Sequence, residues 1–387
     1  MSYVVREWLN LAVRWTHVFA AIMWVGQTYF FTWLDHTFQN EKQVWMVHSG
    51  GFYIVDKQKR PELLNQTLHW FKWEAFFTLV SGFVLLVLVY YDGGIMVDDD
   101  ILKMTAWQAA GLSLALIAVG WFVYDFLWIS PLRKHEVAGT ILSYLLLVGS
   151  IVGVLHLFAS RAAYMQIGAM LGTFMALNVW MRILPAQRQL IAAVKAGTEP
   201  DMRLADLAKQ RSKQNTYIVL PVVFIMISNH FPVIFGNDFN WAILAGLTLT
   251  SVAVRHYHNL YEKGQRPAWL LPFAAIALIA LVFVTAPVPK KSAKDLPPVS
   301  FQSIQPIIQR RCVTCHSSKP TDDLILIAPN GIMFDTPEEI KTHADRILVR
   351  AVQTKTMPQG NKTGITEEER EMLGVWIEQG AKVEIGD

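Results

Sequence analysis

Cys312-Val313-Thr314-Cys315-His316, near the C-terminus, sets the expected structure of the last part of the chain. C-x-x-C-H is the pattern at which a c-type haem is attached, the two thiols forming thioethers and the histidine binding the iron. The 387-residue chain has only these 2 cysteines, which excludes a disulfide framework and disfavours a zinc site or a thioredoxin-like pair. The motif predicts one covalent haem c on Cys312 and Cys315, with His316 on the iron.

The second iron ligand is expected further along the chain. Met357 lies in Thr356-Met357-Pro358-Gln359, between two short helical patterns. A methionine thioether opposite histidine is a common axial pair in cytochromes c, and a loop methionine beside a proline is poorly suited to helix packing. His343 is the competitor, but the charged sequence around it predicts an exposed position within a helix. Met357 is therefore the predicted sixth ligand.

Helix-start signals surround the motif. Thr336-Pro337-Glu338-Glu339 and Thr366-Glu367-Glu368-Glu369 are two capping boxes, the first with proline at the first helical position. The second opens a helix that carries Leu373, Trp376 and Ile377 on one face. Residues 299–387 are therefore expected to form a small α-helical domain like a class I cytochrome c.

The composition of the rest points to a membrane. The chain is 53% hydrophobic with 14 tryptophans, and its formal net charge is only +3, without a basic patch that would suggest nucleic-acid binding. The first apolar segment is too long and too aromatic for a cleavable signal peptide. Lipid is therefore an expected partner, and nucleic acid is not.

Eight apolar stretches are long enough to cross a bilayer, and a proline- and lysine-bearing linker follows them. The expected fold class is all-α: an eight-helix transmembrane bundle (1–287), a linker (288–298) and the cytochrome c domain (299–387). The expected spans are 8–34, 70–91, 104–129, 138–160, 162–184, 215–236, 240–261 and 269–287.

Two arguments give the orientation. Haem c is attached on the periplasmic side, so the C-terminal domain is expected there, and eight spans place the N-terminus there too. Independently, sixteen cations fall in the expected cytoplasmic segments and three in the periplasmic ones, in agreement with the positive-inside rule. The cytoplasmic set is Lys42, Lys57, Lys59, Arg60, Lys72, Arg133, Lys134, Arg182, Arg188, Lys195, Arg203, Lys209, Arg211, Lys213, Lys263 and Arg266, against Arg6, Lys103 and Arg161. A bacterial inner-membrane protein with both termini in the periplasm is expected.

Two cytoplasmic segments are too long for plain turns. Residues 35–69 contain an aromatic stretch that we expect to pack against the helix ends. Residues 185–214 resemble an amphipathic surface helix, a break at 197–200 and a second charged helix.

Ionisable side chains inside a bilayer are costly, so each is a candidate functional residue. In the periplasmic half these are Arg14, His17, His156 and His230. Histidines from different helices can hold a haem b, with Arg14 near a propionate; alternatively each histidine bonds across a helix interface. In the cytoplasmic half the group is His69, Glu74, Asp125, Arg182 and Arg255, with His256 and His258 beside them. For these, ion pairs near the headgroups are the alternative to a ligand site.

Several of these residues lie in segments that resemble the membrane-bound urate hydroxylase family, in which a multi-span domain is fused to a cytochrome c. The likeness covers nearly the whole chain. It is carried by Arg14-Trp15-Thr16-His17-Val18, Trp24-Val25-Gly26, Val44 to Tyr53, Leu68-His69-Trp70-Phe71-Lys72-Trp73-Glu74, Ser228-Asn229-His230-Phe231-Pro232 and the C-x-x-C-H motif. The first span also resembles membrane protoporphyrinogen oxidases, which favours His17 as an iron ligand, and copper-resistance D proteins.

The resemblance implies oxidation of urate to 5-hydroxyisourate, with water supplying the oxygen and electrons leaving through haem c to a respiratory acceptor, a cytochrome or a terminal oxidase. A planar urate anion needs a cation, a proton acceptor and an aromatic wall. The sequence offers Arg182 or Arg255 as the cation, Glu74 or Asp125 with His69 as the acceptor, and Trp70 or Trp73 as the wall.

Two other functions fit the same sequence. The first is a non-catalytic membrane cytochrome subunit that relays electrons for a partner enzyme. The second is a transporter or metal exporter with a redox domain, which is disfavoured because no methionine- or histidine-rich loop is expected on the periplasmic side.

Overall fold

The computed structural model describes residues 3–58, 67–286 and 296–383, and the chain is mostly helical. Helices fall on all eight ranges where apolar spans are expected. They are α1 (Tyr3–Thr37), α2 with the π-helical η1 (Trp73–Leu85, Leu86–Tyr91), α3 (Ala106–Ile129), α4 (Glu136–Leu155), α5 with the π-helical η3 (Ser160–Leu177, Asn178–Ile183), α7 (Met202–Ser228), α9 (Asn240–Glu262) and α10 (Leu270–Thr285). Three short helices complete this part: η2 (Pro131–Lys134), α6 (Leu184–Lys195) and α8 (Pro232–Phe235).

The expectation of an all-α fold is wrong at one place. The aromatic stretch after α1 forms an antiparallel hairpin of β1 (Gln43–His48) and β2 (Gly51–Asp56), in which His48 pairs with Gly51. Ser49 and Gly50 both have positive φ, 50° and 76°, which is the requirement of a two-residue type I′ turn. Helical periodicity alone did not reveal this turn.

Two helices are longer than the spans expected from hydropathy. The break after α6 falls at the expected place, since α7 begins at Met202, but α7 then runs without interruption to Ser228. The second charged helix and the sixth apolar stretch are therefore one helix. In the same way, α5, η3 and α6 follow one another without a loop from Ser160 to Lys195.

Four helices in the described part are long and apolar enough to cross a membrane: Trp73–Tyr91, Ala106–Ile129, Glu136–Leu155 and Ser160–Lys195. The apolar helix α10 is shorter, with 16 residues. Large apolar side chains cover the outside of the bundle, among them Trp15 at 75%, Trp107 at 86% and Phe283 at 76% exposure. A bilayer would shield this surface, so the exposure is consistent with membrane association.

The C-terminal part of the described chain, residues 296–383, has a hydrophobic core of its own and is called the tail domain below. Its helices are α11 (Phe301–Arg311), η5 (Pro329–Gly331), α12 (Pro337–Thr342), α13 (Ala344–Ile347), η6 (Leu348–Gln353), η7 (Gln359–Asn361) and α14 (Glu367–Glu378). Both expected capping boxes are confirmed, because the Thr336 and Thr366 hydroxyls accept from the N–H groups of Glu339 and Glu369. Phe301, Leu373 and Trp376 meet in the core, with Cys312 packed at its edge.

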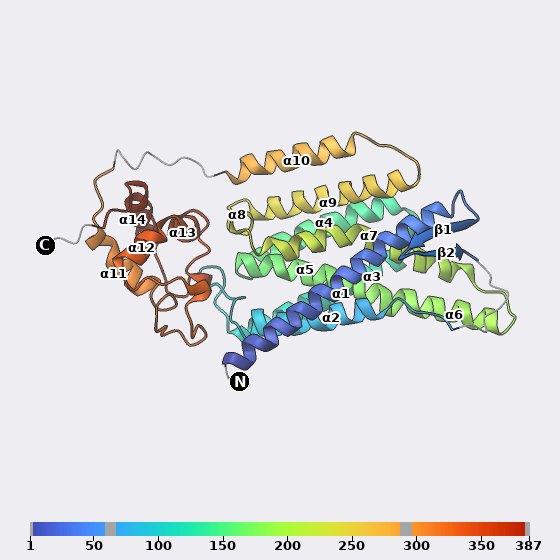
Figure 1. Cartoon of the computed structure of the whole chain (residues 1–387), viewed down its shortest axis with the longest axis horizontal. Helices are drawn as coiled ribbons and strands as arrows, with labels where there is room; N and C mark the ends of the chain where they lie inside the picture. Colours follow the sequence, from blue (N-terminus) through green and yellow to red (C-terminus); the bar gives the residue numbers. More distant parts are fainter. Residues whose placement is uncertain (1–2, 59–66, 287–295, 384–387) are drawn as a thin grey trace.

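The tail domain lies at one end of the bundle (Figure 1). The N-terminus of α1, the loop between η1 and α3, and α8 lie at the same end, whereas the β-hairpin and the connection after α6 lie at the other. The segments expected on one side of a membrane are thus together at one end of the bundle. The bundle has a hydrophobic core separate from that of the tail domain, and it includes Tyr164, Ile167 and Phe174.

Candidate functional site

The C-x-x-C-H segment follows α11 directly. The His316 Nδ1 lies 3.0 Å from the carbonyl oxygen of Ile332; because a carbonyl only accepts, this nitrogen carries the proton and Nε2 keeps a free lone pair. Burial lowers the pKa of His316, which favours the neutral ring. The Phe334 ring packs against it at 5.2 Å. A neutral imidazole oriented by a backbone carbonyl is the usual form of a metal-ligating histidine.

The two thiols are free and half-buried. Burial raises the pKa of Cys312 to about 12, and burial together with Asp322 raises that of Cys315 to about 11. Both are therefore protonated near neutral pH, unlike the reactive thiolates of redox pairs. In the described ranges, no group of three or more His, Cys, Asp or Glu side chains could hold a metal ion. These residues fit thioether attachment of haem.

Met357 lies in a loop between η6 and α14, half-buried. Its N–H donates to the Arg350 carbonyl at 2.9 Å, and its own carbonyl accepts from Arg370 at 2.8 Å. Arg370 is buried, 5% exposed, and also donates to Ala351. The expectation that His343 lies exposed within a helix is wrong: it is half-buried at the junction of α12 and α13, with its ring 6.2 Å from Phe334.

In the bundle, Asp125 and Arg182 form an ion pair, and a second arginine completes it. Arg182 Nε donates to Asp125 Oδ1 at 2.9 Å, and Arg211 donates to the same oxygen at 2.7 Å. Arg211 is fully buried, although the sequence had placed it in a cytoplasmic loop. Asn178 and Tyr124 continue this network on its inner side. Asp125 thus holds α3 against η3 through Arg182 and against α7 through Arg211.

Arg255 is in a different situation. It is fully buried, and its Nη2 donates to Thr32 Oγ1 at 3.0 Å, while in the described part of the chain Nε and Nη1 have no hydrogen-bond partner. Its guanidinium lies 3.9 Å from the Tyr29 ring centroid. Buried polar atoms are nearly always paired, so unpaired donors on a buried cation call for an anion or ordered water.

Other unpaired polar atoms lie near Arg255 on the same two helices. On α9, His258 Nδ1 and Asn259 Oδ1 are buried without a partner, and so is His36 Nδ1 on α1. The ring of His258 packs edge-on against Tyr29 at 5.1 Å. Donors, an acceptor and an aromatic face thus gather between α1 and α9. This is the composition expected of a site for a planar, polar anion.

A second group of unpaired atoms surrounds the start of α2. Glu74 Oε2 and Trp180 Nε1 are buried without a partner. Trp24, Trp70 and Trp180 pack around the small core cluster of Ala75, Val179 and Leu184. The ammonium of Lys72 lies 5.0 Å from the Trp73 ring, with Trp70 and Trp180 about as close at 6.0 and 5.9 Å.

One face of α1 connects the two groups. Trp24, Thr28 and Thr32 follow at intervals of four residues, which places them on the same side of the helix. Thr32 contacts Arg255, and Trp24 packs against the cluster that contains Ala75, the residue after Glu74. Eight residues of helix span about 12 Å.

The remaining candidates are spread along the bundle. His69 is exposed in the segment before α2, so it does not lie within that helix. His17 Nδ1 is within 3.1 Å of the Thr78 carbonyl on α2, and a Cβ on Gly82 would lie 2.9 Å from its ring. His156 is exposed at the end of α4, with Nδ1 2.8 Å from the Val152 carbonyl. The other two are exposed as well: Arg14, bonded to Asn10, and His230, after α7.

The hydrogen bonds of His17 and His156 decide which ring nitrogen is free to bind a haem b iron. The Nδ1 atoms of His17 and His156 lie beside carbonyl oxygens, as in His316, which leaves Nε2 of each ring open. In the part of the chain that the structure describes, no contact joins any two of His17, His156 and His230.

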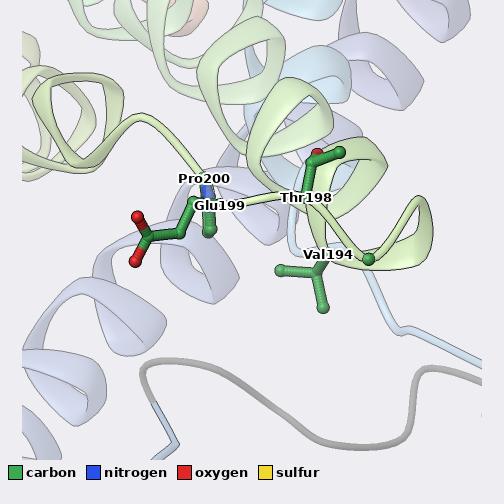
Figure 2. Close-up of a pocket in the computed structure, with 5 residues that line it drawn as sticks. Val194, Thr198, Glu199 and Pro200 are labelled. Carbon is green, nitrogen blue, oxygen red and sulfur yellow. The ribbon is translucent and has the colours of Figure 1, made fainter.

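A surface depression is lined by none of these residues. It is lined by Val194, Thr198, Glu199 and Pro200 with Gly197, at the connection between α6 and α7 (Figure 2). It contains a carboxylate and no cation, so it does not suit an anion.

Sequence reasoning missed Tyr29, Thr32 and Lys72 around the unpaired atoms, and Arg211 in the ion-pair network. Thr32 lies one turn after Thr28 on the face of α1 that carries Trp24, a signal that was available, whereas no pattern singled out Tyr29. The pairing of Arg211 depends on the unbroken course of α7, for which hydropathy gives no signal.

The fold and these sites define the class: a mostly helical protein with helices of membrane-spanning length and a buried arginine with two unpaired nitrogens. Residues 3–286 match the family model described as urate oxidase N-terminal, and the chain belongs to this family. Membership indicates an oxidoreductase that acts on urate. No curated protein and no solved structure matches the chain.

Proposed function

We propose that the chain is a membrane-bound urate hydroxylase that converts urate and water to 5-hydroxyisourate. The balance is one urate plus one water giving one 5-hydroxyisourate, two protons and two electrons. The protons require an acceptor at the site, and the electrons leave through haem c to a respiratory acceptor. Family membership supports the substrate, and the two unpaired nitrogens on the buried side chain of Arg255 are the observation that carries the location of the site.

Arg255 is the better of the two candidate cations. Arg182 is already paired with Asp125, so a substrate would have to compete with a buried carboxylate. Arg255 has no ion pair in the described part of the chain, and two of its nitrogens are open. Urate is a monoanion near neutral pH, and the open Nε and Nη1 of Arg255 can donate charge-assisted hydrogen bonds to it. The Tyr29 ring supplies a face against which a flat ligand can pack.

Glu74 is the proposed proton acceptor. Its Oε2 is buried and unpaired, whereas the carboxylate oxygens of Asp125 accept from two arginines. A carboxylate that is held by two cations is a poor base, because its charged form is stabilised. The face of α1 formed by Trp24, Thr28 and Thr32 runs from Arg255 toward the cluster next to Glu74, and Trp180 adds an aromatic ring to that cluster.

In the tail domain, Cys312 and Cys315 would hold haem c, with His316 and Met357 as iron ligands. The group would accept electrons one at a time. Two electrons leave each urate, so a second electron carrier helps, and we extend the proposal to a haem b on His17. His156 and His230 are the candidates for its other ligand, and Arg14 for a propionate.

We further propose a bacterial inner-membrane location with eight spans and with the tail domain in the periplasm. The expected periplasmic segments lie at one end of the bundle, beside the tail domain, which supports this topology (Figure 1). Removing Arg182 and Arg211 from the count of loop charges leaves fourteen cations against three, so the charge bias still holds.

Anaerobic addition of urate to the purified, oxidised full-length chain tests the proposal. Urate should reduce haem c. Arg255→Met should lower kcat/KM for urate by about 100-fold, because about 3 kcal/mol of charge-assisted hydrogen bonding is lost. Arg203→Met is the matched control, since the Arg203 side chain is 85% exposed. If haem c is intact and urate reduces none of it, the chain is instead a cytochrome subunit that serves a partner enzyme.

A further inference from the structure

The loop that carries Met357 lies directly on the end of the bundle. A Cβ built on Gly236, at the end of α8, would overlap the carbonyl oxygen of Thr354 and lie 2.8 Å from Thr356 Cγ2. A Cβ on Gly360 would overlap the carbonyl oxygen of Val97 in the loop between η1 and α3. Backbone therefore meets backbone on both sides of Met357, and only glycine permits this approach.

Polar contacts join the same surfaces. Asn361 Nδ2 donates to Asp100 Oδ2 at 2.7 Å. The carboxylates of Asp98 and Asp100 lie close enough to Arg370 to act on its pKa, which burial lowers. Arg370 in turn holds the Met357 carbonyl. The acidic loop of the bundle thus faces the cation that fixes the predicted ligand loop.

One interaction opposes this contact. Arg161 at the start of α5 and Arg350 in η6 are of like charge, and Arg161 adds to the effect of burial in lowering the pKa of Arg350. Neither arginine has an ion pair in the described ranges 3–58, 67–286 and 296–383. These like charges oppose the approach at Gly236 and Gly360, so the contact rests on the close fit of backbone at the two glycines and on the hydrogen bond from Asn361 to Asp100.

We propose that the tail domain docks on the bundle through residues 354–361, so that electrons enter its haem site from the Met357 side. Gly236 and Gly360 are then positioning residues, because a side chain at either would push the two parts of the chain apart. The electron route rests on the proposed function, whereas the docking does not. Electron transfer slows steeply with distance, so separation of the surfaces slows the internal step without altering the haem site.

Cross-linking tests the docking without urate. In the full-length chain, Asp100→Cys with Asn361→Cys should be joined by a short thiol-reactive cross-linker. After cleavage at a protease site inserted into residues 288–298, the haem-stained tail should then stay with the bundle on a denaturing gel. The control is Asp100→Cys with Gln302→Cys, because α11 lies on the side of the tail domain away from the bundle (Figure 1). Equal cross-linking of both pairs, or of neither, overturns the docking.

Gly236→Ala tests the positioning role. It should lower the yield of that cross-link and slow haem c reduction by urate by an order of magnitude or more, while reduction by ascorbate and the haem spectrum stay unchanged. Gly172→Ala is the matched control, since no atom outside its own helix lies within 4 Å of a Cβ there. Unchanged cross-linking and rates in Gly236→Ala refute the proposal. If urate fails to reduce haem c in the parent chain but the cross-link forms, only the proposed function fails.

Discussion

Replacement of Asp125 by asparagine separates a structural role from a catalytic one. The Asp125 carboxylate is 9% exposed and accepts from Arg182 and from Arg211, whose side chain is 0% exposed. Asp125→Asn leaves the Arg211 cation buried without a counter-charge. Breaking a buried pair in this way costs about 3–5 kcal/mol, more than an exposed pair contributes. The variant should therefore unfold at much lower denaturant or temperature than the parent chain.

The assay is detergent-solubilised unfolding followed by circular dichroism, with a nearby exposed pair as control. Lys213 lies two residues after Arg211 and pairs with Glu136, and these side chains are 50% and 52% exposed. Glu136→Gln should cost less than about 1 kcal/mol. Combining Asp125→Leu with Arg182→Met and Arg211→Met should recover most of the lost stability, because no buried charge is then left unpaired. If Asp125→Asn keeps full stability but loses urate oxidation, Asp125 is a base and the assignment to Glu74 is wrong.

Three further predictions concern the ligand loop of Met357, the acid stability of the tail domain and the number of haems. Arg370→Gln removes the donor to the Met357 carbonyl and should weaken the charge-transfer absorbance of methionine-ligated ferric haem, with Met357→Ala abolishing it; an unchanged band in Met357→Ala excludes this ligand. Burial alone would raise the pKa of Glu369, but the pair with Arg311 and the Thr366 N–H lower it overall. Ionised Glu369 therefore contributes its full stabilisation above about pH 4.3, the pKa of glutamate in the unfolded chain. This stabilisation is lost as the pH falls through the lower pKa of Glu369 in the folded chain. Arg311→Gln should move acid unfolding, followed by Soret circular dichroism, to higher pH, and an unmoved midpoint contradicts this. A pyridine haemochrome spectrum should show b-type and c-type haem in near-equal amounts, with the b-type band lost in His17→Ala.

The local pattern of the sequence determined the positions of the helices and of the haem motif. Apolar runs marked all eight long helices of the bundle, and threonine–glutamate boxes marked the starts of α12 and α14 to the residue. These features depend on neighbours within a few positions, so they can be read without a fold. The hairpin β1–β2 was not predicted, because its turn requires a positive φ at Ser49. Serine rarely adopts a positive φ, and a hydropathy pattern does not indicate one.

Tertiary structure decided which polar side chains are paired and which remain open. By sequence, Arg182 and Arg255 were equal candidates for the substrate cation, and Arg211 belonged to a loop. The rotation of α7 against α3 brings Arg211 and Arg182 onto Asp125, and the packing of α9 on α1 leaves Arg255 with Thr32 and Tyr29. The contact of Gly236 with Thr354 likewise joins residues more than a hundred positions apart. Which polar side chains pair inside a helical bundle depends on the rotation of each helix about its axis and on which helices are neighbours. The local sequence determines neither of these.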